Sequence, residues 1–118
     1  MLNVLVWLVA LYVTVCPAWG QEASRADDVV EGGKLAVIVC AYCHVAARDQ
    51  PYKPILQPPA PSFESIAQRK GINADWLKTF MTATHRGLDN PNGMPNAELL
   101  DFQIRQVTAY LLSLRKNP

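Results

Sequence analysis

The five residues Cys40-Ala41-Tyr42-Cys43-His44 have the most specific chemistry in this chain of 118 residues. Residues three positions apart on a helical turn point to nearly the same side, so Cys40 and Cys43 can present both thiols together. The imidazole of His44 follows immediately and can reach a metal from that side. The stretch therefore places two sulfur nucleophiles and one nitrogen ligand at the end of a helix that we predict over residues 29–41.

This C-x-x-C-H spacing is typical of the covalent attachment of a c-type haem. The thiols of Cys40 and Cys43 can each add to one of the two vinyl groups of the haem, and His44 can bind the iron. One covalent haem c is therefore the predicted cofactor. Zinc binding would need a second pair of ligands, and the other cysteine and histidine are Cys16 and His85. A thioredoxin-type redox pair would need several strands, whereas the rest of the sequence favours helices.

Length and charge allow one small domain and argue against a nucleic-acid partner. The chain holds 11 Lys and Arg against 10 Asp and Glu, a net charge of +1, whereas nucleic-acid-binding domains usually have a strong basic bias. Residues 21–118 suffice for a single domain. A core of this size benefits from a large apolar cofactor as a staple.

The N-terminal stretch predicts an exported protein. Residues 2–15, LNVLVWLVALYVTV, are almost wholly apolar, and the small residues Ala18 and Gly20 precede a plausible signal-peptidase cut before Gln21. We therefore predict that residues 1–20 are a signal peptide and that the mature domain is periplasmic or otherwise exported.

Two alternatives remain for this leader because no Lys or Arg precedes its apolar run. Residues 2–19 are just long enough for an uncleaved membrane anchor, and Cys16 could instead be lipidated. Each alternative also places residues 21–118 outside the cytoplasm. A membrane is an expected partner only where the leader is retained.

Caps and apolar spacing predict an all-α fold with two long loops. Residues 21–26 are polar and are expected to fray. The last predicted helix has the strongest apolar stripe, formed by Leu100, Ile104, Val107, Leu111 and Leu114. The expected helices are 29–41 with its start at Asp28, a short helix between Ser62 and Gly71, a helix from an Asn73 cap to about Thr84, and one from an Asn96 cap to about Arg115; the loops are 46–61 and 85–96.

Over residues 24–116 the sequence resembles the class I c-type cytochromes. The resemblance implies a small cytochrome c fold of about four helices around one covalent haem, in which the helix that ends in C-x-x-C-H crosses a C-terminal amphipathic helix. It places Gly32 at that crossing, packed against Tyr110.

The resemblance also implies the remaining haem contacts. Met94, in Asn92-Gly93-Met94-Pro95, is expected to be the sixth iron ligand, with His85 as a rival. The carbonyl of Pro61 is expected to accept a hydrogen bond from His44. Trp76 could donate to a haem propionate or could simply pack in the core.

Three further residues lie near these loops. Met81 is expected to lie in the core, Arg86 to balance propionate charge or remain an exposed cation, and Tyr52 to have an equally open role.

The function implied is electron transfer between exported redox proteins, with no reaction catalysed by the chain itself. One alternative is a haem c subunit of an exported dehydrogenase or oxidase, in a hetero-complex with that enzyme. Another is a ligand-binding or peroxidase-like haem protein, which requires that Met94 does not bind the iron.

Overall fold

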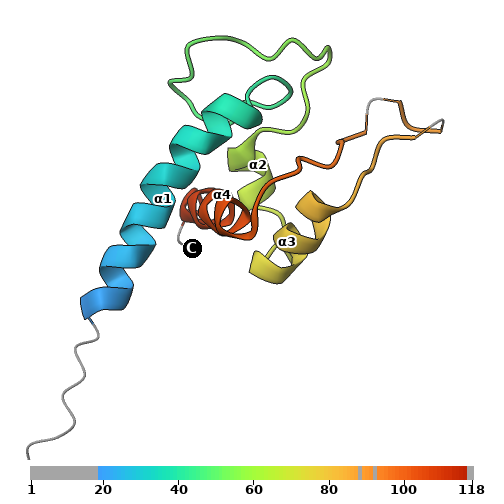
Figure 1. Cartoon of the computed structure of the whole chain (residues 1–118). Coiled ribbons are helices and arrows are strands. Elements are labelled where there is room, and N and C mark those ends of the chain that lie inside the picture. The colour runs from blue at the N-terminus through green and yellow to red at the C-terminus, as the bar shows by residue number, and fades with distance from the viewer. Residues whose placement is uncertain (1–18, 88, 92, 117–118) are drawn as a thin grey trace, which may run out of the picture.

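Figure 1 shows the computed structural model of the chain, which describes residues 19–87, 89–91 and 93–116. The described part contains four helices and no strand, so the expected all-α fold is confirmed. Two long loops, one on each side of α2 and α3, extend from the helices (Figure 1). Most of the expected leader, residues 1–18, lies outside the described residues. The helices are α1 (Trp19–Val39), α2 (Phe63–Ala67), α3 (Ala74–Thr82) and α4 (Asp101–Ser113).

The crossing of α1 and α4 is the most extensive helix contact in the described part of the chain, and α4 lies against the middle of α1 in Figure 1. A Cβ on Gly32 would lie 1.9 Å from the backbone oxygen of Gln106, and one on Gly33 would lie 3.2 Å from the ring of Tyr110. The predicted crossing at Gly32 is confirmed. Its expected partner is only partly right, because Gly32 meets mainly the backbone of Gln106, while the ring of Tyr110 covers Gly33.

The N-terminal limit predicted for α1 is wrong. The helix begins at Trp19, so residues 21–26 are helical instead of frayed. This segment contains no proline, and its Glu, Ala and Arg residues are good helix formers. Asp28 lies inside the helix, and its carboxylate accepts a hydrogen bond of 3.1 Å from Arg105 Nε on α4.

Two of the predicted helix caps are confirmed. Ser62 Oγ accepts from the backbone N–H of Ser65 at 3.2 Å, and Asn73 Oδ1 accepts from that of Trp76 at 2.8 Å. Each side chain satisfies a donor that the first turn of a helix leaves without an internal partner. Gly71, with φ of 86°, lies in the turn that joins α2 to α3.

The expected start of the last helix at Asn96 is wrong, because α4 begins five residues later. Asn96 Oδ1 accepts from the N–H of Glu98 at 3.0 Å, and Glu98 has a φ of 52°, which an α-helix cannot continue. Leu100 is consequently outside the helix and 61% exposed, although it belonged to the predicted stripe. The stripe residues Ile104, Val107 and Leu111 are buried as expected.

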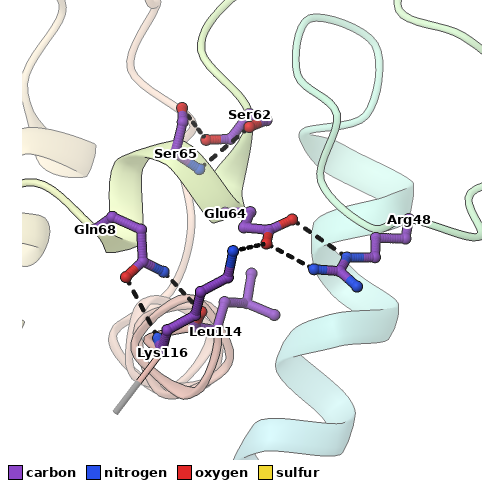
Figure 2. A network of polar contacts seen from close by, with 7 residues as sticks. All are labelled: Arg48, Ser62, Glu64, Ser65, Gln68, Leu114 and Lys116. Atoms are coloured by element: carbon purple, nitrogen blue, oxygen red, sulfur yellow. Dashed lines mark hydrogen bonds and ion pairs between the residues drawn. The ribbon is translucent and has the colours of Figure 1, made fainter. Parts of the chain in front are cut away.

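A polar network ties α2 to the segment after His44 and to the C-terminal end of α4 (Figure 2). Glu64 accepts hydrogen bonds from Arg48 at 2.6 and 3.2 Å and pairs with Lys116 at 3.4 Å. Gln68 donates to the carbonyl of Leu114 at 3.0 Å and accepts from the N–H of Lys116 at 3.3 Å. Through this network, α2 is bonded both to the segment that contains Arg48 and to the C-terminal end of α4.

Candidate functional site

The turn that follows α1 brings the two cysteines and the histidine together. The N–H of Cys40 donates to Ala36 O at 2.9 Å, and both Cys43 and His44 donate to the carbonyl of Cys40, at 3.1 and 2.9 Å. These bonds continue the helix as a tight turn, so the position of the motif follows from α1. Both cysteines are half-buried free thiols.

The environment of Cys40 keeps its sulfur protonated. Burial, and secondarily the charge of a neighbouring Cys43 thiolate, raise the pKa of Cys40 to about 11. A thiol with such a pKa carries little thiolate at neutral pH and is therefore a poor nucleophile towards disulfides.

The imidazole of His44 is oriented from the segment that precedes α2. Its Nδ1–H donates to the carbonyl of Pro61 at 2.7 Å, so the bond implied by the resemblance is present. The ring of Phe63 meets that of His44 edge-on at 5.5 Å. Backbone bonds from Ala60 to Cys43 and from Phe63 to Val45, at 2.9 and 3.0 Å, pair the two segments. Because Nδ1 is occupied, Nε2 is the nitrogen that could bind a metal.

The first long loop, residues 46–61, is bonded to the end of α1 and to the turn that follows it. The N–H of Ile55 donates to the carbonyl of Tyr42 at 3.0 Å, and the hydroxyl of Tyr52 donates to that of Val37 at 3.0 Å. Tyr52, whose role the sequence left open, therefore binds the loop to α1. Gln50, which the sequence did not single out, accepts from the N–H groups of Ala46 and Ala47 at 2.7 and 3.2 Å.

The second loop holds Met94 by its backbone. Its carbonyl accepts from the N–H of His85 at 2.7 Å. A Cβ on the buried residue Gly93 would lie 1.9 Å from the carbonyl oxygen of His85, so only glycine permits this approach. Asn90 donates its side-chain amide to the same oxygen at 3.1 Å, and Arg86 Nε donates to the carbonyl of Gly93 at 3.3 Å. The side chain of Met94 is half-buried against the core.

The remaining expected site residues lie on or beside α3. Trp76 is 42% exposed and stacks on Phe80, while Met81 is buried in the core as expected. The ring of Phe80 also stacks on the imidazole of His85. The sequence did not single out Phe80 or Asn90 for these roles, because neither a stack between helix and loop nor a bond across a loop has a local sequence signature.

The donors present suit a covalent haem. Two free thiols and an oriented imidazole lie on one turn, and the half-buried Met94 offers a sulfur atom from the second loop. Four of the eleven buried core residues in the described part of the chain are alanines, so the core itself supplies few large apolar side chains. In the same part of the chain no cluster of three or more His, Cys, Asp or Glu could hold a bare metal ion, so nothing there favours zinc.

A helical fold with a C-x-x-C-H turn at the end of its first helix, and with its last helix packed across that helix, defines the class of small c-type haem proteins. A model of the family described as cytochrome c matches residues 29–115. This match spans most of the chain, and the chain belongs to the cytochrome c family. Searches of curated proteins and of solved structures returned no match.

Membership of this family has general functional consequences. Cytochromes c bind haem c and transfer electrons, and cytochrome c domains are typically exported. Among the described helices none combines the length and the apolar character needed to cross a bilayer.

Proposed function

We propose that this chain is an exported electron carrier whose haem c is bound covalently by Cys40 and Cys43 and ligated by His44 and Met94. The observation that carries the proposal is the way both ligand residues are held. The bond from His44 to Pro61 orients the imidazole, and the bond from His85 to the carbonyl of Met94 anchors the second loop.

Each residue has a distinct task in this proposal. The bound haem supplies one-electron chemistry between ferrous and ferric iron. The carbonyl of Pro61 accepts a hydrogen bond from Nδ1–H of His44 and thereby strengthens Nε2 as an electron-pair donor to the iron. The soft thioether of Met94 favours the ferrous state and raises the reduction potential. If His44 and Met94 both hold the iron, no position would remain for a substrate, and the chain would catalyse no reaction of its own.

The proposal extends to export and to partners. Residues 1–20 would direct export and be removed before Gln21, or residues 2–19 would remain as an anchor. The partners would be a redox protein that donates the electron and another that accepts it. A net charge of +1 gives only weak electrostatic steering towards such partners. A hydrogen bond from Trp76 to a haem propionate remains a prediction.

A second candidate function is that of a haem subunit in an exported dehydrogenase or oxidase. Three large apolar side chains near the motif, Ile38, Tyr42 and Ile55, are 75, 61 and 64% exposed. Contiguous exposed apolar patches mark protein interfaces, so a partner that covered these three side chains together would account for their exposure. Gel filtration of the native protein from its host distinguishes the two, because a subunit elutes with its enzyme and a free carrier elutes near 13 kDa, or somewhat below once the leader is removed.

The ligation by Met94 is tested by comparing Met94→Ala with Met81→Leu, a change in the buried core. We expect Met94→Ala to keep the haem, because the thioethers are untouched, but to lose the long-wavelength sulfur-to-iron band of the ferric protein completely. Its reduction potential should fall and carbon monoxide should bind the ferrous iron. Met81→Leu should retain the band.

A wild-type protein that lacks the band and binds carbon monoxide readily would contradict the proposal. The ligand-binding or peroxidase-like alternative would then be the better account of this site.

A further inference from the structure

Three aromatic rings form a continuous stack on the side of α3 that leads into the second loop. The ring centroids of Trp76 and Phe80 are 4.8 Å apart, with planes 13° from parallel. Those of Phe80 and His85 are 3.9 Å apart, with planes 14° from parallel. The imidazole of His85, five residues beyond Phe80, therefore lies flat on the last turn of α3.

The same imidazole also caps α3. Its Nε2–H donates to the carbonyl of Phe80 at 3.1 Å, an oxygen in the last turn of the helix. Carbonyls in the last turn have no partner further along the helix. The N–H of Ala83 also donates to the carbonyl of Phe80, but this hydrogen bond is long, at 3.4 Å. Stacking and capping together fix the ring of His85 to α3.

The backbone of His85 connects this anchored ring to the expected iron ligand. Its N–H donates to the carbonyl of Met94 at 2.7 Å, and its carbonyl accepts from the amide of Asn90 at 3.1 Å. Gly93 packs against that carbonyl with no room for a Cβ. A displacement of His85 would therefore move the backbone of Met94 with it.

We propose that His85 is a positioning residue for Met94: its ring anchors the loop to α3, and its backbone sets where the methionine is held. This inference rests on the proposed ligation by Met94. It gives the histidine that could have competed for the iron a different task, because its ring is engaged by Phe80. His85 thus connects α3, which its ring contacts, to Met94, which its backbone N–H binds.

The test uses the haem-loaded full-length protein and titrates its ferric form with imidazole, which competes with Met94 for the iron. The sulfur-to-iron band reports the bond directly, so a general loss of stability does not mimic the effect. We expect His85→Ala to bind imidazole roughly threefold to tenfold more tightly than the wild type, since one aromatic stack is lost. Its reduction potential should also fall.

Three further variants separate the contributions. His85→Phe keeps a stacking ring but loses the Nε2–H donor and cannot bind iron, so its imidazole affinity should lie between those of the wild type and His85→Ala. Thr84→Ala, an exposed change at the preceding residue, should have no effect. Phe80→Leu removes the partner ring and should act in the same direction as His85→Ala, which keeps the test decisive where His85→Ala yields no folded protein.

Each outcome has a separate meaning. A wild-type band together with an unchanged affinity in both His85→Ala and Phe80→Leu would overturn the positioning role and leave ligation by Met94 intact. A His85→Phe protein that binds imidazole as tightly as His85→Ala does would overturn anchoring by the stack, because a ring at this position would then contribute nothing. A wild-type protein without the band would remove the ligation itself and the positioning role with it.

Discussion

At the level of single residues, Glu64 has the most connected side chain of the polar network in Figure 2. Hydrogen bonds from Arg48, and then those from Lys116, lower the pKa of Glu64. A carboxyl whose pKa is lower in the folded state stabilises that state above its unfolded pKa, and the contribution is lost as the pH falls through the folded pKa. The pairs are exposed, so salt should weaken them.

We therefore expect Glu64→Gln to lower the melting temperature modestly at neutral pH, with a difference from the wild type that shrinks below about pH 4.5, the ordinary value for this group. Thermal unfolding from pH 7 to pH 3, at low and high salt, measures this. Glu98→Gln is the matched control, because Glu98 is exposed and forms no ion pair among the described residues. A difference that grows on acidification would contradict the assignment.

At the level of helices, the glycines of α1 set how closely α4 can approach. A Cβ on Gly32 would meet backbone at 1.9 Å, whereas one on Gly33 would meet the edge of a tyrosine ring at 3.2 Å. Backbone cannot move aside without moving α4, but a ring can shift slightly. Replacing glycine by alanine inside a helix also gains about 1 kcal/mol of helix propensity, so the two sites should respond differently.

We expect Gly32→Ala to lower the free energy of unfolding by about 2 kcal/mol or more through overpacking. Gly33→Ala should be nearly neutral, because its propensity gain offsets the tighter contact. Gly87→Ala is the control, since a Cβ there would meet nothing within 4 Å. Denaturant unfolding of the three proteins gives the order, and an equal response at Gly32 and Gly87 would refute the crossing.

At the level of the whole molecule, the described core is small for the chain that surrounds it. Four of its eleven buried residues are alanines, and several large apolar side chains remain exposed. A domain of about 100 residues with so little buried apolar surface is marginal on hydrophobic burial alone. A covalently held haem would add the missing apolar contacts.

The double change Cys40→Ala and Cys43→Ala should therefore abolish haem that survives denaturation and sharply reduce the amount of folded protein. Haem staining of a denaturing gel and the yield of soluble protein measure the two effects. Tyr42→Ala is the control, because Tyr42 lies between the cysteines but is exposed. Haem that stays with the double variant through denaturation would disprove the thioether bonds.

Local signals in the sequence were sufficient for the motif, the helical class and two of the caps. The thiols and imidazole of Cys40, Cys43 and His44 lie within one turn, so their proximity depends on covalent spacing alone. Ser62 and Asn73 cap helices that begin at the next residue, and this interaction is equally local. Buried positions at Ile104, Val107 and Leu111 followed from helical periodicity.

Contacts between distant segments required the folded chain. The start of α1 at Trp19 and the late start of α4 at Asp101 depart from local cap signals. Asp28 lies inside α1 and binds Arg105 of α4, and the left-handed backbone of Glu98 delays the start of α4. The stack of His85 on Phe80 joins a loop to a helix through non-periodic positions. Such pairings depend on where α3, α4 and the second loop meet in space, and no spacing of residue types along the chain encodes that meeting point.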